Sequence, residues 1–127
     1  MSYATNKTMF FGRGSVEAGA DLSASSGLGF KFSGATAVLA TANACHGVII
    51  DGMTASGDQV ACGFGECLAI AAEAIAMNEY VTTDSAGKFV VASTSTDKPV
   101  GIALSKAGAD GDVFQCFIYG PLDEVVA

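Results

Sequence analysis

The chain has 127 residues, and its 13 acidic and 6 basic side chains give a formal net charge of −7 at pH 7. Charged residues make up only 15% of the sequence, which excludes a coiled coil and a disordered chain driven by charge. Glycine does not recur at every third position, so a collagen helix is excluded too. A chain this acidic repels phosphates, and we therefore expect no nucleic acid partner. Half of the residues are apolar, 16 are Gly and none is Trp, which predicts one domain with a thin core.

The first 27 residues predict an irregular N-terminal arm. Met9, Phe10 and Phe11 form a short apolar cluster between Lys7 and Arg13, and a stretch rich in Gly, Ser and Ala follows. The polar start of the chain is not followed by the apolar stretch that a secretory signal requires, and no segment resembles a membrane span. We therefore expect a protein that stays in a reducing cytoplasm and has no membrane partner.

From Leu28 onward the pattern predicts short β-strands. Alternating or β-branched apolar residues occur at 30–32, 38–39, 48–50, 60–64 and 67–70, separated by Gly, Ser, Asn or Asp. Ala71–Met77 has high helix propensity but covers only about two turns, so it predicts a single helical turn.

The last third of the chain has the clearest pattern. Tyr80–Thr83 and Lys88–Ser93 flank the turn Asp84–Gly87 and predict a hairpin, and two more strands are predicted at 100–104 and 113–119. Short strands separated by turns predict an all-β fold: a small β-barrel or β-tulip-like sandwich with one short helical turn and an N-terminal arm. The predicted boundaries are 1–27 for the arm, 28–120 for the β domain and 121–127 for a C-terminal tail. No internal sequence repeat indicates a solenoid.

The cysteines do not have the spacing of a metal site, and no Cys-x-x-Cys pair occurs among Cys45, Cys62, Cys67 and Cys116. We expect them to be small buried side chains in strands, with a disulfide as the alternative. Cys45-His46 is the one nucleophile–base candidate. In a strand these neighbours would point to opposite faces and could not share a hydrogen bond.

Other candidate sites are also better explained as turns. Gly63–Glu66 and Gly27–Gly29 resemble fragments of phosphate-binding loops, but neither lies between a strand and a helix N-terminus. Asp110 and Asp112 lack the following Glu of a calcium loop. Lys88, beside a hairpin turn, only weakly resembles the attachment site of lipoyl and biotinyl carriers. We therefore expect no enzymatic activity, no cofactor and no metal, and a binding or structural role is favoured.

The order of motifs in the second half of the chain resembles the head decoration (capsid cement) proteins of tailed bacteriophages. The matching segments are the Ala-rich turn at 71–79, the Thr-x-Asp-x-x-Gly hairpin within Tyr80–Val90, the strand Val100–Leu104, the turn Ala109–Asp112 and a last strand to Ile118. Ser56–Val60 also resembles an earlier Gly-Asp-x-Val step of that family.

The resemblance implies a compact, non-enzymatic β domain on the outer face of an icosahedral head. The partner would be the major capsid protein, whose neighbouring subunits a homotrimer at local threefold sites would clamp after shell expansion. Such a virion protein would be assembled in the host cytoplasm. Its negative charge would keep it soluble, and several modest contacts made together would raise its affinity for the shell.

The candidates for contact with the capsid are Lys7, Met9, Phe10, Phe11 and Arg13. A segment of two cations around an apolar cluster could add as a strand to a sheet edge of the capsid. The alternatives are the first strand of the chain's own domain or a frayed terminus.

Three other interpretations stay open. The first is a fibre- or tail-associated structural β module of a virion, which would have the same composition. The second is a small enzyme or carrier domain, for which only Cys45, His46 and Lys88 could be nominated. The third is a bacterial surface protein, which the lack of an export signal disfavours.

Overall fold

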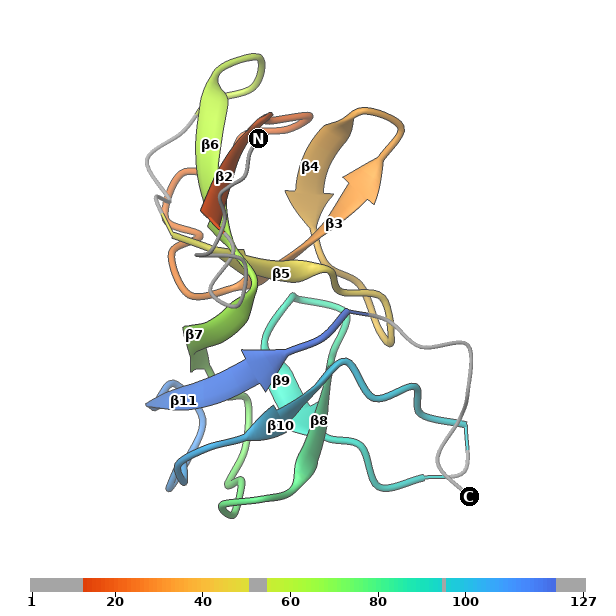
Figure 1. Ribbon diagram of the computed structural model, residues 1–127, viewed down its shortest axis with the longest axis vertical. Helices are drawn as coiled ribbons and strands as arrows, with labels where there is room; N and C mark the ends of the chain where they lie inside the picture. The colour runs from red at the N-terminus through yellow and green to blue at the C-terminus, as the bar shows by residue number, and fades with distance from the viewer. Residues whose placement is uncertain (1–12, 51–54, 95, 121–127) are drawn as a thin grey trace, which may run out of the picture.

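The computed structural model describes residues 13–50, 55–94 and 96–120, and these residues form two antiparallel sheets of five strands each. The first half of the chain builds one sheet and the second half builds the other, and the two lie end to end along the long axis (Figure 1). The chain passes from the first to the second between Gly63 and Gly65, where one strand ends and the next begins. The prediction of an all-β, sandwich-like fold is confirmed.

The first sheet has the strand order β2-β6-β5-β3-β4. Its strands are β2 (Arg13–Glu17), β3 (Gly29–Ser33), β4 (Thr36–Leu39), β5 (Gly47–Ile49) and β6 (Gln59–Gly63). Phe30 of β3 and Val60 and Cys62 of β6 are buried in the core of this sheet. A tight turn at Gly34, with φ of 61°, joins β3 and β4.

The second sheet has the order β7-β11-β10-β8-β9. Its strands are β7 (Gly65–Ile70), β8 (Tyr80–Thr83), β9 (Phe89–Val91), β10 (Gly101–Ala103) and β11 (Val113–Ile118). The predicted hairpin is confirmed as β8 and β9. Asp84 holds the turn between them, because its carboxylate accepts hydrogen bonds from the backbone N–H groups of Ala86 and Lys88.

The two sheets are copies of one topology. If β2–β6 are matched in order with β7–β11, the two strand orders become identical. The residue pairings match as well: Phe30↔Gly47 corresponds to Val81↔Gly101, and Ile49↔Cys62 corresponds to Ala103↔Cys116. We call residues 13–63 repeat 1 and residues 65–118 repeat 2.

The connections between strands are duplicated too. Ala18 N donates to Asp58 O and Gly57 N donates to Ala18 O in repeat 1, and Ala71, Asp112 and Gly111 make the corresponding two bonds in repeat 2. Gly57 and Gly111 have φ of 91° and 92°, a region that favours glycine. No repeat in the sequence indicates a solenoid, and this duplication of the fold was not predicted from it.

Each repeat surrounds its own apolar cluster. In repeat 1 the cluster is Ala18, Leu22, Phe30, Ala37, Ile49, Val60 and Cys62. The cluster of repeat 2 is larger, with Phe89 and Phe114 at its centre, and it also takes in Ala40, Cys45 and Val48 from repeat 1. These three side chains join the two repeats through the apolar core.

Three expectations for the backbone need correction. Arg13–Glu17 is strand β2, not part of an irregular arm, because it pairs with all of β6. Ala71–Met77 is not a helical turn, because Ala71 bridges to Phe89 and Ile75 bridges to Ala107. The described strands do not close a barrel, because no ladder of paired residues joins the two edges of either sheet. Only one isolated parallel bridge connects the two edges in each repeat: Ala18↔Ala37 in repeat 1 and Ala71↔Phe89 in repeat 2.

Among the described residues, no helix of a length and apolar character that would cross a membrane occurs.

Candidate functional site

The outer face of the second sheet carries a set of apolar side chains, four of them exposed and one, Ile102, half-buried. We call Leu68, Tyr80, Ile102, Val113 and Phe117 the apolar face. Leu68 is 62% exposed, Val113 59%, Tyr80 56% and Phe117 37%. Side chains alternate along β11, so Phe114, Cys116 and Ile118 fill the core while Val113 and Phe117 point outward.

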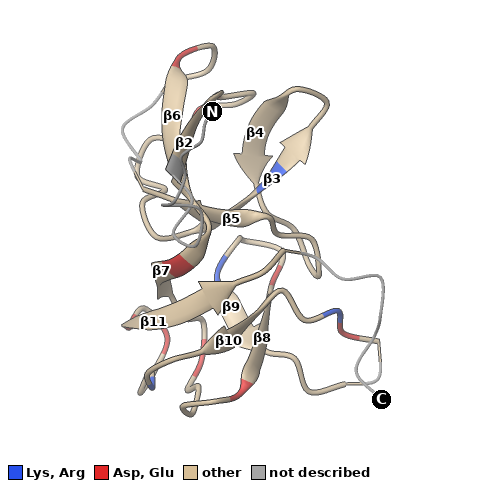
Figure 2. Cartoon of the chain, in the orientation of Figure 1, with Lys and Arg blue, Asp and Glu red and all other residues tan. Residues whose placement is uncertain are grey.

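Strand pairing brings these residues together. Phe117 pairs with Ile102 across β11 and β10, and Ile102 pairs with Tyr80 across β10 and β8. Leu68 pairs with Gln115, next to Val113 on the same face. Paired side chains on one face lie within contact distance, so the five residues share one surface. Gln115, which donates a hydrogen bond to Glu66, lies on the same surface between Val113 and Phe117. β10 and β11 have no charged residue, as their uniform tan in Figure 2 shows.

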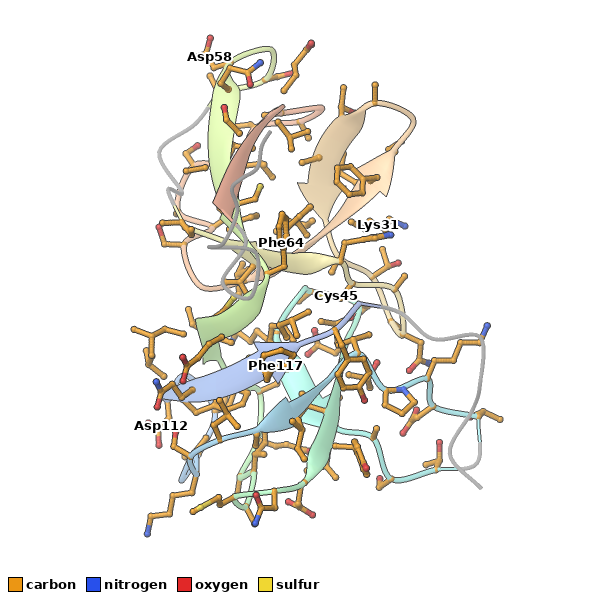
Figure 3. The ribbon with its side chains drawn as sticks, viewed as in Figure 1. Lys31, Cys45, Asp58, Phe64, Asp112 and Phe117 are labelled. Atoms are coloured by element: carbon orange, nitrogen blue, oxygen red, sulfur yellow. The ribbon has the colours of Figure 1, made fainter. Side chains whose placement is uncertain are left out.

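Two hollows lie where the repeats meet. The first has a volume of about 470 Å³. Its lining includes Ile50, Gly63 and Phe64 on one side and Cys67, Leu68 and Ile70 of β7 on the other. The second, of about 380 Å³, includes His46, Phe64, Phe117 and Tyr119. Phe64 borders both, and Figure 3 shows it at the crossing above Phe117.

The cysteines are not joined in a disulfide. Cys45, Cys62 and Cys116 are fully buried, as expected, whereas Cys67 is partly exposed and lines the first hollow. Burial raises the pKa of Cys45 to about 12 and that of Cys62 to about 11, and it raises the pKa of Cys116 further. A thiol reacts as its thiolate, so these three are held in an unreactive form.

This difference predicts selective labelling. Iodoacetamide at mildly alkaline pH should modify Cys67 first in the folded protein, and all four cysteines after unfolding. Peptide mass spectrometry over a time course measures the order. A Cys67→Ser variant, as the control, should stay unmodified over the same period. Equal labelling rates at Cys116 and Cys67 would contradict the burial of Cys116 beneath the second sheet.

Cys45 and His46 do not form a nucleophile–base pair. The Cys45 thiol donates to Gly47 O at 3.1 Å, and the pKa of this thiol is raised. His46 packs with its ring centroid 5.0 Å from that of Phe32, and its Nδ1 is buried with no hydrogen-bond partner among the described residues. Desolvation lowers the pKa of His46, so its neutral form is favoured.

The acidic candidates are parts of turns, and the glycine-rich candidate Gly63–Glu66 spans the end of β6 and the start of β7. Asp112 accepts hydrogen bonds from the N–H groups of Gly108 and Ala109, and Asp110 forms an ion pair of 3.0 Å with Lys88. Gly27 and Gly65 have φ of 84° and 79°, where the chain turns at the junction of the repeats. In the part of the chain that the structure describes, no three His, Cys, Asp or Glu residues gather as a metal site.

Four of the candidates for capsid contact, Lys7, Met9, Phe10 and Phe11, lie outside the described residues. Arg13, the fifth, begins β2 and pairs with Gly63 at the end of β6. The apolar face was not predicted from the sequence. The signal for it was present in β11, where apolar residues occupy both alternating sets of positions, although a strand with one solvated face needs only one set.

The fold is similar to that of a solved phage protein. The crystal structure of the head fiber gp8.5 N base in bacteriophage phi29 superposes with a TM-score of 0.64 and 18% sequence identity. The match covers 89% of this chain and 98% of that one. No family model and no curated protein sequence matches this chain. The likeness shows that the two chains share a fold.

Proposed function

We propose that this chain is a structural protein of a bacteriophage virion that binds the outer surface of the expanded head and staples neighbouring major capsid subunits. The observation that carries the proposal is the fold match over almost the whole length of a head fiber base. The motif order of residues 69–120 supports it independently, since it resembles head decoration proteins.

The proposed mechanism is multivalent attachment. A homotrimer would present three copies of each weak contact to the shell, and linked contacts raise the overall affinity without any single strong one. Because Arg13 is held in the first sheet by its pairing with β6, contacts made by residues 7–11 would be transmitted directly to a folded domain.

A second candidate function is supported by the same match. The structural neighbour is the base of a head fiber, and in this second function the chain is the part of a fibre that sits on the virion. The two candidates differ in what the protein touches: a stapling protein contacts several capsid subunits, and a fibre base anchors a further protein.

The deciding experiment mixes the purified chain with expanded, undecorated heads of the same phage and images them by electron cryo-microscopy. Added density at local threefold sites, touching more than one capsid subunit, is the expected result. Bare heads would overturn the stapling function, and added density that does not join neighbouring capsid subunits would favour the second candidate.

The predicted contact segment is tested by replacing Met9, Phe10 and Phe11 with serine. Head binding measured by co-sedimentation is expected to weaken roughly tenfold or more, because aromatic anchors dominate the energy of such contacts. The control is Phe32→Ser, which removes a 43% exposed aromatic side chain from β3. Equal binding by both variants would exclude residues 9–11 as the contact.

A further inference from the structure

The two repeats allow each position of the fold to be compared with its copy. Across the first sheet, Gly29, Val48 and Gly63 pair in one row. The corresponding row of the second sheet is Tyr80, Ile102 and Phe117, which are three residues of the apolar face. One row therefore has two glycines where the other has two aromatic side chains.

The row of repeat 1 is covered by repeat 2. Val48 is only 2% exposed and belongs to the apolar cluster of repeat 2. A Cβ placed on Gly29 would lie 2.9 Å from Sγ of Cys45 and 3.1 Å from Cγ2 of Thr83. One placed on Gly63 would lie 3.0 Å from Cδ1 of Ile50 and 3.6 Å from Sγ of Cys67. The glycines thus leave room for side chains of both repeats, including Thr83 and Cys67 of repeat 2. No described part of the chain covers the corresponding row of repeat 2 in this way.

The comparison also shows that the fold does not require these apolar side chains. Leu68 and Val113 occupy the positions that Ser15 and Gln59 occupy in repeat 1, and those residues pair in the same register. Repeat 1 therefore builds the same two strands with polar residues at the same places. Apolar side chains that are exposed and dispensable for the fold indicate an interaction surface.

We propose that the apolar face binds the apolar face of other copies of this chain. Its shape is suited to self-association, because it has both exposed apolar side chains and hollows: Leu68 and Val113 line the first hollow, and Phe117 lines the second. In a ring of identical subunits, one edge of the surface on each copy meets a different edge on the next, so exposed side chains of one copy would enter a hollow of its neighbour.

The distribution of acidic residues also favours another copy of this chain as the partner of the apolar face. Two copies of a chain with a net charge of −7 repel one another, and the repulsion is smallest where both surfaces have fewest acidic groups. The strands β10 and β11 have none, and Glu66 lies at the end of the row, next to Phe117. The inference rests on the proposed function in one respect, since it names the surface through which the proposed homotrimer would form.

The test uses substitutions matched between the repeats. Leu68→Glu with Val113→Glu puts charges on the apolar face, and Ser15→Glu with Gln59→Glu puts the same charges at the corresponding positions of repeat 1. Light scattering coupled to gel filtration gives the mass without any phage head present. The unchanged chain and the repeat 1 variant are expected at threefold the 12.7 kDa of one chain, and the repeat 2 variant at 12.7 kDa.

Circular dichroism checks that each variant is folded. If the glutamates unfold repeat 2, the milder pair Leu68→Ser with Val113→Gln replaces them, because these residues copy positions 15 and 59. A repeat 2 variant that is folded and keeps the full mass would overturn the proposal.

A monomeric unchanged chain would also overturn the proposal. If that monomer bound heads and lost binding with Leu68→Glu and Val113→Glu, the apolar face would belong to the capsid contact instead. If the trimer forms but the heads stay bare, the stapling function is overturned and the apolar face remains the self-association surface.

Discussion

Replacing Gly101 with alanine is expected to lower the free energy of unfolding by about 3 kcal/mol. A Cβ at this position would lie 2.5 Å from the backbone carbonyl oxygen of Phe117. That oxygen belongs to the neighbouring strand β11, so β10 and β11 would have to separate to relieve the clash. Gly47, the matching residue of repeat 1, is in the same situation, because a Cβ there would clash with the backbone carbonyl oxygen of Gly63.

The same substitution at Gly14 is the control. Gly14 lies in β2, and a Cβ there would meet nothing closer than Cζ of Phe64 at 3.9 Å, an ordinary contact. Urea denaturation of the three variants measures the effect. Gly47→Ala and Gly101→Ala should lose similar amounts of stability, and Gly14→Ala should stay close to the unchanged chain. A Gly101→Ala variant as stable as the Gly14→Ala variant would show that β10 and β11 do not pair in this register.

Local patterns predicted much of the second sheet. The hairpin of β8 and β9 has β-branched strands around an Asp-x-x-Gly turn, and β11 is an apolar run between Gly111 and Gly120. Such signals lie within a few residues of each other, so they can be recognised without knowing the fold.

Elements that depend on distant partners could not be predicted in this way. β2 has the sequence RGSVE, with one large apolar residue, and it is a strand because it pairs with β6 nearly fifty residues later. Ala71–Met77 has the composition of a helix, yet Ala71 and Ile75 bridge to Phe89 and Ala107. Tertiary pairing outweighed local helix propensity there, as it often does in short segments.

The duplication was hidden because most matching positions carry different residues. The clearest shared sequence is Gly57-Asp58-x-Val60-x-Cys62 and Gly111-Asp112-x-Phe114-x-Cys116, which covers one turn and one strand. Elsewhere a glycine in repeat 1 matches Tyr80 or Phe117 in repeat 2. These differences hide the repeat in the sequence. The same differences identify the apolar face, because they place apolar side chains on repeat 2 where repeat 1 has glycine.

Replacing Phe114 with alanine is expected to cost about 3–5 kcal/mol of stability, the largest effect of any substitution considered for this chain. Phe114 is 1% exposed, and its ring meets that of Phe89 edge to face with centroids 6.1 Å apart. Its removal leaves a cavity at the centre of repeat 2 that the surrounding strands cannot fill. Phe32→Ala is the control, because it truncates an aromatic residue that is 43% exposed on β3 and lies outside the apolar face.

The shape of the unfolding curve adds a second result. We expect one transition for the unchanged chain and for Phe114→Ala, because hydrogen bonds and a shared apolar core join the two repeats in addition to the covalent backbone. Gly29 N donates to Gly87 O at 2.8 Å, Ile70 N donates to Gly27 O at 3.0 Å, and Thr83 Oγ1 donates to Thr41 O at 2.7 Å. Cys45 and Val48 are part of the core of repeat 2.

The partner variant Phe30→Ala makes a cavity in the core of repeat 1, where Phe30 is fully buried. If the repeats unfold together, both cavities lower the midpoint of the same transition, whether it is followed by circular dichroism or by exposure of the buried cysteines. Two transitions, one moved by Phe30→Ala and the other by Phe114→Ala, would show that each repeat is a separate folding unit. The contacts at Gly29, Thr83 and Val48 would then be too weak to couple the two halves.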